Sequence, residues 1–108
     1  MAWLELSVEE LAAWRQAGKA HTLLDVREPW EISTASMGAD QMVPMAEIPG
    51  ACAVLSQLPQ PLVVLCHAGV RSARVAAFLS QQGFTQVYSL AGGIDAWSCR
   101  VDPSVPRY

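Results

Sequence analysis

Short aliphatic runs alternate along this chain with longer segments in which apolar residues recur at helical spacing. The runs are bounded by proline, glycine or polar residues, which is typical of buried strands. We expect strands at residues 4–6, 21–26, 41–43, 62–65 and 87–90, the first of them at a sheet edge. We expect helical segments at residues 8–17, 28–31, 45–58, 72–82 and 94–97, the third of them broken by Pro49-Gly50.

This alternation of strands and helices, joined by short loops, predicts an α/β fold. Such connections give a central, mostly parallel sheet of about five strands with helices on both faces. Several helix ends carry their own signals, because Ser7 and Glu10 form a capping box and Gly18 and Gly83 can end helices in the left-handed conformation. We expect the 108 residues to form one domain, residues 1–108.

Composition and charge exclude several function classes. The net charge is −3 without a basic run, so nucleic-acid binding is not expected. No apolar stretch reaches membrane-spanning length, and the first residues lack the features of a signal peptide. Neither the three cysteines nor the two histidines have disulfide-framework or metal-ligand spacing. We therefore expect a cytoplasmic protein with no metal, no cofactor and no membrane partner.

Cys66 is the residue that points most directly to chemistry. It follows the aliphatic run Leu62–Leu65 and precedes a helix, so residues 66–72, Cys-His-Ala-Gly-Val-Arg-Ser, form a tight strand-to-helix loop. Backbone N–H groups at a helix N-terminus favour negative charge, and we expect a thiol there to exist partly as the thiolate. The alternative, a buried structural cysteine, is common for cysteine in general. Gly69, which allows a close approach of the backbone, and the polar neighbours His67 and Arg71 favour the interpretation of Cys66 as a nucleophile.

The other residues near this loop are candidates for binding or supporting roles. Arg71 either binds an anionic group of a substrate or braces the loop, and His67 either contacts substrate or is a bystander. Active sites of parallel sheets lie beyond the carboxyl ends of strands. Asp25 and Arg27 lie at such an end, where we expect an ion pair that supports the loop rather than takes part in the reaction. Arg74 is expected to be a solvated charge, Trp30 and Trp97 to pack, and Cys52 and Cys99 to be structural.

Three stretches of the chain together resemble the single-domain rhodanese-like proteins. They are Leu24-Asp25-Val26-Arg27-Glu28-Pro29, then the loop Cys66-His67-Ala68-Gly69-Val70-Arg71-Ser72, then Gly83-Phe84 through Val87-Tyr88, followed by Leu90-Ala91-Gly92-Gly93-Ile94 and Trp97. The resemblance implies a parallel sheet flanked by helices and sulfur transfer through a persulfide on Cys66, with residues 67–72 holding the sulfur. One departure lies between residues 35 and 40, where the family's Gly-His-Ile-x-Gly-Ala-like run is replaced by Ala-Ser-Met-Gly-Ala-Asp.

The resemblance implies a small-molecule sulfur donor such as thiosulfate and an acceptor that is a thiol or cyanide. A persulfide relay that acts with a protein sulfur acceptor would use the same Cys66 chemistry and remains an alternative. A second alternative is a cysteine phosphatase-like or arsenate-reductase-like enzyme. The active-site loop of those enzymes typically reads Cys-x5-Arg, whereas Cys66 to Arg71 reads Cys-x4-Arg. This shorter loop favours binding of a single sulfur atom over binding of a tetrahedral oxyanion.

Overall fold

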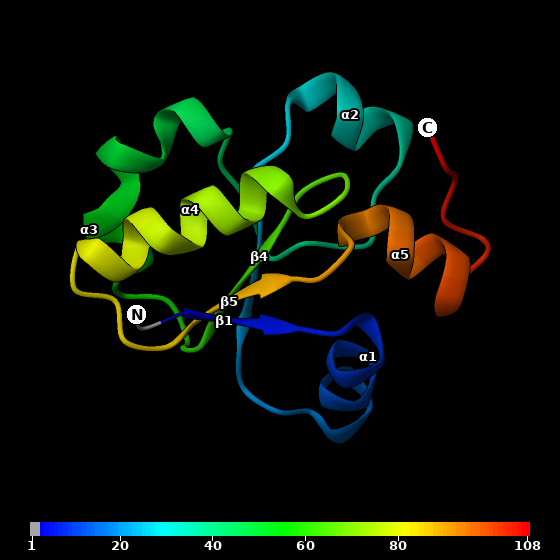
Figure 1. Cartoon of the computed structure of the whole chain (residues 1–108), viewed down its shortest axis with the longest axis horizontal. Helices are drawn as coiled ribbons and strands as arrows, with labels where there is room; N and C mark the ends of the chain where they lie inside the picture. The colour runs from blue at the N-terminus through cyan, green and yellow to red at the C-terminus, as the bar shows by residue number, and fades with distance from the viewer. Residues whose placement is uncertain (1–2) are drawn as a thin grey trace.

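A five-stranded parallel sheet forms the centre of the protein in a computed structural model that describes residues 3–108. The strand order is β1-β5-β4-β2-β3. The strands are β1 (Trp3–Leu6), β2 (Thr22–Asp25), β3 (Gln41–Met42), β4 (Leu62–Leu65) and β5 (Val87–Leu90). The helices are α1 (Val8–Ala17), α2 (Pro29–Thr34), the 3₁₀ helix η1 (Met45–Ala51), α3 (Cys52–Leu55), α4 (Val70–Gln81) and α5 (Gly93–Arg100). The α/β architecture predicted from the sequence is confirmed (Figure 1).

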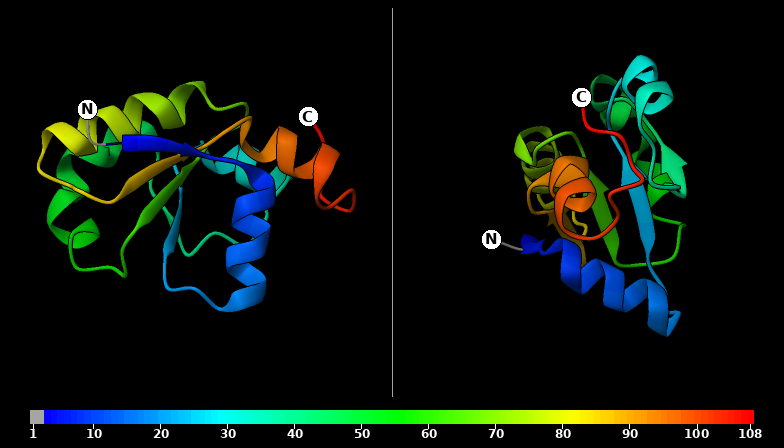
Figure 2. Two further views of the ribbon diagram at one scale, coloured as in Figure 1. Left: turned by 60° about the horizontal axis from the view of Figure 1, so that its bottom comes forward. Right: turned by 90° about the vertical axis from the view of Figure 1, so that its right-hand side faces the viewer.

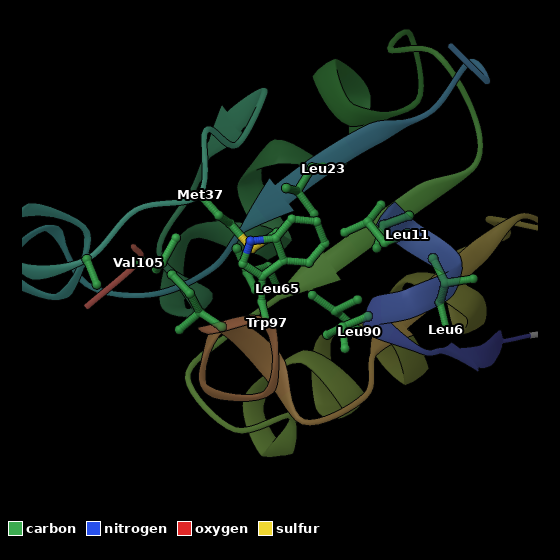
Figure 3. Close-up of a cluster of buried hydrophobic side chains, with 12 residues drawn as sticks. Leu6, Leu11, Leu23, Met37, Leu65, Leu90, Trp97 and Val105 are labelled. Atoms are coloured by element: carbon green, nitrogen blue, oxygen red, sulfur yellow. The ribbon is translucent and has the colours of Figure 1, made fainter. Parts of the chain in front are cut away.

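The sheet separates two hydrophobic clusters, because successive side chains of a strand point to opposite faces. On one face, Leu23, Leu65 and Leu90 pack against α1 and α5, with Trp97 in the middle of the cluster (Figure 3). On the other face, strand residues including Leu24 and Val64 pack against η1, α3 and α4. The helices therefore cover both faces of the sheet, as the views in Figures 1 and 2 also show.

Most predicted element boundaries agree with the structure to within one or two residues. Ser7 caps α1 in a capping box with Glu10, and Gly18 ends this helix with a φ of 67°. The broken helix expected over residues 45–58 is divided into η1 and α3. Of the two tryptophans expected to pack in the core or at its rim, Trp97 is buried, whereas Trp30 is 64% exposed and contacts the ring of Tyr108 at the surface.

The predicted start of the helix after Cys66 is wrong by two residues. The sequence predicted a loop up to Ser72, but α4 begins at Val70. Gly69 precedes it with a φ of 104°, a conformation that glycine adopts without strain and other residues rarely adopt. The chain therefore turns within fewer residues than expected, and Arg71 and Ser72 lie in the first turn of α4.

The carboxyl ends of β2 and β4 lie side by side, since these two strands pair in parallel register with Asp25 opposite Leu65. The segments that follow them, residues 26–34 and 66–72, therefore meet at the carboxyl-terminal end of the sheet.

Within residues 3–108, no helix is long and apolar enough to cross a membrane.

Candidate active site

Cys66 lies at the carboxyl end of β4 with only 1% of its surface exposed. Its Sγ accepts a hydrogen bond from the Gly69 backbone N–H at 3.1 Å, and the thiol donates to the Ser72 hydroxyl at 3.4 Å. Both partners come from the residues that turn the chain into α4. The loop therefore surrounds the sulfur with polar groups although the side chain is buried.

The Ser72 hydroxyl belongs to a short buried chain of hydrogen bonds behind the sulfur. It donates to the Gly69 carbonyl at 3.2 Å and lies 2.7 Å from the Ser89 hydroxyl on β5. Both serines are fully buried. The Ser72 oxygen is thus held next to Sγ by two other groups, because a buried hydroxyl is costly to leave without partners.

The backbone of the loop is fixed from the other side by the N-terminus of α5. The Ile94 N–H donates to the Cys66 carbonyl and the Asp95 N–H donates to the His67 carbonyl, each at 3.0 Å. This approach is possible only because residue 93 is glycine, since a Cβ there would lie 2.5 Å from the Cys66 oxygen. Gly93, part of the Leu90–Ile94 stretch that resembles the family, therefore makes room for the Cys66 loop.

Asp25 and Arg27 form the predicted ion pair at the end of β2. Arg27 Nη2 lies 2.7 Å from Asp25 Oδ2, and neither side chain has more than 1% of its surface exposed. The same guanidinium donates to the carbonyls of Glu31 and Ala35, which hold α2 and the segment after it. A buried charge needs this full set of partners. The pair therefore supports the segment that faces the Cys66 loop.

Arg71 forms a bidentate ion pair with Glu31 of α2. Its Nη1 and Nη2 atoms lie 2.7 and 2.8 Å from the two carboxylate oxygens of Glu31. These hydrogen bonds are the main reason that the pKa of Glu31 falls to about 2, and they also raise the pKa of Arg71. Of the two roles considered for Arg71, the contacts agree with bracing the loop, because both terminal nitrogens are engaged by Glu31.

Tyr108 lies at the edge of this site and links its parts. Its hydroxyl donates to Glu31 Oε2 at 2.7 Å and accepts from Arg27 Nη1 at 3.0 Å. Its ring stacks on the imidazole of His67, with centroids 4.2 Å apart and planes 19° apart. His67 therefore contacts a neighbouring aromatic side chain. Burial raises the pKa of the Tyr108 hydroxyl, so it stays protonated near neutral pH.

The structure thus brings together the residues selected from the sequence at one end of the sheet. Ala68 and Val70 are exposed beside the buried Cys66, and Arg74 is exposed as predicted. Cys99 is exposed on α5, which disagrees with the expected structural role, whereas Cys52 is half-buried and donates to the Ile48 carbonyl.

Sequence reasoning missed Glu31 and Tyr108. Glu31 stands three residues after Glu28, whose N–H it accepts, and this local capping pattern could have indicated a held carboxylate. Nothing local indicates its partners, because Arg71 is 40 residues away and Tyr108 is 77 residues away.

The match to a family model agrees with the fold and with this arrangement. The model of the rhodanese-like domain matches residues 7–99, which is most of the chain, and the protein belongs to this family. Thiosulfate sulfurtransferase GlpE of Stutzerimonas stutzeri is 34% identical over 89 residues, which cover 82% of this chain and 79% of GlpE.

Two other relatives extend the comparison. The rhodanese-like/PpiC domain-containing protein 12, chloroplastic, of Arabidopsis thaliana is 44% identical over 90 residues, covering 80% of this chain but only 30% of that protein. The crystal structure of a rhodanese-related protein from Thermoplasma volcanium superposes with a TM-score of 0.79 at 30% identity, covering 96% of this chain and 98% of that one. The chain thus matches some relatives along most of their length and others along less than a third.

Proposed function

We propose that this protein is a sulfurtransferase that carries sulfane sulfur as a persulfide on Cys66. The observation that carries the proposal is the Cys66 loop, in which a buried thiol at a strand end receives a hydrogen bond from the Gly69 N–H. A backbone donor aimed at sulfur stabilises negative charge there, both on the thiolate and on a transferred sulfur. The similarity to a protein named as a thiosulfate sulfurtransferase supports the same reaction.

The reaction consists of two displacements at sulfur. In the first, the Cys66 thiolate attacks the outer sulfur of a donor such as thiosulfate. A new S–S bond forms, the S–S bond of thiosulfate breaks, and sulfite leaves with the bonding electron pair. In the second, an acceptor thiolate or cyanide attacks the terminal sulfur of the persulfide, and the Cys66 thiolate is released. The two displacements together need no external oxidant or reductant.

The arrangement of Arg71 argues against a phosphatase-like or arsenate-reductase-like reaction. Such a reaction needs a guanidinium that is free to hold a tetrahedral oxyanion. Here one N–H of each terminal nitrogen of Arg71 donates to Glu31, so the pair of parallel donors that would hold an oxyanion bidentately already holds a carboxylate. The Cys-x4-Arg spacing is also one residue shorter than the loop typical of those enzymes. Both observations favour sulfur as the transferred group.

A persulfide relay with a protein acceptor is the second candidate. Val70 in the loop and Trp30 beside Tyr108 each expose 64% of their surface, so a partner protein can reach apolar groups at the rim of the site. The Arabidopsis relative also carries its rhodanese-like part within a longer protein. The relay uses the same Cys66 persulfide and differs only in the acceptor.

Steady-state sulfur transfer from thiosulfate to cyanide or to a small thiol tests the proposal. The matched variants are Cys66→Ser, Cys52→Ser and Cys99→Ser, which remove one thiol each. We expect Cys66→Ser to lose activity by about 10³-fold or more, because it removes the nucleophile. We expect the other two to retain activity. Full activity of Cys66→Ser would assign the reaction to another thiol and refute the proposal.

A further inference from the structure

The last eight residues of the chain form a tail, residues 101–108, that returns past α5 toward α2 (Figures 1 and 2). Its position is fixed at several points. Val105 is 7% exposed within the cluster around Trp97, and its carbonyl accepts a hydrogen bond from Ser98. Arg107 pairs with Asp95 at 2.9 Å. These contacts place Tyr108 over the Cys66 loop.

The hydroxyl of Tyr108 connects the two ion pairs that support this loop. It accepts from Arg27, whose charge is balanced by Asp25, and it donates to Glu31, whose carboxylate holds Arg71. A phenol has one proton to donate, and here that proton is directed to the carboxylate. The hydroxyl therefore limits the positions that the Glu31 carboxylate can take, and through Glu31 those of Arg71.

The ring of Tyr108 acts on a different part of the loop. It is stacked on His67, the residue directly after Cys66, and it makes an edge-to-face contact with Trp30, with ring centroids 6.0 Å apart. The stack restricts the rotation of the imidazole. Because the His67 backbone is also bonded to α5, the stack holds the ring in one position beside the nucleophile.

We propose that Tyr108 is a positioning residue of the Cys66 site. Its ring holds His67 and its hydroxyl holds the Glu31–Arg71 ion pair, so that the Cys66 loop keeps the shape in which sulfur is accepted. This inference rests on the proposed sulfur-transfer function, but its structural part concerns only the reactivity of the Cys66 thiol. The two can therefore be tested separately.

Two substitutions separate the ring from the hydroxyl. Tyr108→Phe keeps the ring and removes the bridge between Arg27 and Glu31, whereas Tyr108→Leu removes both. Tyr88→Phe is the matched control, because Tyr88 lies on β5 opposite Val63, three residues before Cys66, and its ring packs against Trp14 of α1. Melting temperatures identify the range in which all variants are folded, and all other measurements are made within that range.

The imidazole signals of His67 in the proton NMR spectrum report on the stack. The chain has only two histidines, so His21 serves as an internal reference. We expect the His67 signals to stay in place in Tyr108→Phe and to lose the ring-current shift in Tyr108→Leu. The rate of Cys66 alkylation by iodoacetamide, measured as a function of pH, reports on the nucleophile without any assumption about sulfur transfer.

We expect kcat/KM for sulfur transfer and the alkylation rate to change by about two- to tenfold in Tyr108→Phe, the effect of one lost hydrogen bond. Tyr108→Leu should add a further change of about two- to tenfold for the lost aromatic contact. Tyr88→Phe should change neither rate. Loss of stability alone moves the melting temperature but leaves the rates and His67 signals of the folded protein where they are.

Unchanged alkylation in Tyr108→Leu, with or without a shift of the His67 signals, would overturn the inference and leave Tyr108 as a packing residue. A second result separates this inference from the proposed function. If the wild-type protein transfers no sulfur while Tyr108→Leu still changes the alkylation of Cys66, the proposed function fails and the positioning role of Tyr108 stands.

Discussion

The two neighbouring strand ends that form the site are built in different ways. At the end of β4, the groups that contact the Cys66 sulfur are uncharged, namely the Gly69 backbone N–H and the Ser72 hydroxyl. At the end of β2, the contacts are made by charged side chains, with Arg27 fully buried against Asp25 and with Glu31 paired to Arg71.

This difference assigns separate tasks to the two regions. Backbone amides can stabilise a charge on sulfur without bringing a counter-charge that a transferred anion would have to displace. Charged pairs, in contrast, hold segments in one arrangement because a broken buried pair is costly. In the proposed function, the β4 end supplies the reactive group, and the β2 end keeps the segment that faces it in place.

The largest effect on stability is expected from the β2 end. Asp25→Asn keeps the shape of the side chain but leaves the buried charge of Arg27 without its carboxylate. We expect a loss of about 3–5 kcal/mol in the free energy of unfolding, measured by urea denaturation. Glu9→Gln is the control, because Glu9 and Arg100 form a pair whose side chains are 50% and 59% exposed. That pair should contribute less than about 1 kcal/mol. Equal losses would contradict the structural role of the buried pair.

The β4 end should respond in activity rather than in stability. One glycine inserted between Val70 and Arg71 shifts the first turn of α4 and separates Ser72 from Cys66. We expect kcat/KM with thiosulfate to fall by about 10²-fold, the cost of misplacing a donor at the reacting atom. Inhibition by phosphate should become measurable, because the longer loop matches an oxyanion cradle.

A glycine inserted between Gly18 and Lys19 is the control for the loop insertion, because both residues are exposed in a turn away from the site. Its kinetics should equal those of the wild type. Unchanged sulfur kinetics in the Val70–Arg71 insertion would show that loop length does not select the transferred group.

The Glu31–Arg71 pair links the two ends and predicts a pH dependence. The pKa of Glu31 is lowered from 4.5 to about 2 in the folded protein. A lowered pKa means that the ionised carboxylate contributes stability, which is complete above pH 4.5 and is lost as the pH falls toward 2. The contribution is roughly 3 kcal/mol by this linkage.

Glu31→Gln should be less stable than the wild type at neutral pH, and the difference should shrink between pH 4.5 and 2. Urea denaturation across this range measures it. Parallel stability curves for the two proteins would contradict the assignment of the low pKa to the pair with Arg71.

The smallest effect is expected from the hydroxyls behind the sulfur. Ser72→Ala removes the hydroxyl nearest to Cys66 and should slow sulfur transfer by about two- to tenfold. Ser89→Ala removes only its partner, 2.7 Å away, and should change the rate less. Single-turnover kinetics of persulfide formation compare the two. A larger effect from Ser89→Ala would show that the hydroxyl next to the sulfur is not the one that matters.

Much of the fold and part of the site could be predicted because their causes are local in the sequence. The aliphatic runs define the strands, and the position of Cys66 directly after one of them follows from the same pattern. Asp25 and Arg27 are two residues apart, so their pairing could also be expected. The start of α4 at Val70 could not, because it depends on the conformation that Gly69 adopts against Gly92.

The remaining part of the site depends on contacts between distant segments. Glu31 meets Arg71 only because β2 and β4 pair in parallel, and Tyr108 reaches His67 only because the tail packs along α5. A single sequence contains no local signal for such contacts. Apart from the Asp25–Arg27 pair, the supporting contacts therefore had to be seen in the structure, whereas the candidate nucleophile Cys66 did not.

The most direct test of the central claim is the intact mass of the protein after incubation with thiosulfate, followed by peptide mapping. Wild type, Cys52→Ser and Cys99→Ser should each gain the mass of one sulfur atom, located on the peptide that contains Cys66. Cys66→Ser should gain none, because it lacks the thiol that attacks the donor. A gain of sulfur in Cys66→Ser, or on a peptide without residue 66, would contradict the assignment of Cys66 as the sulfur carrier.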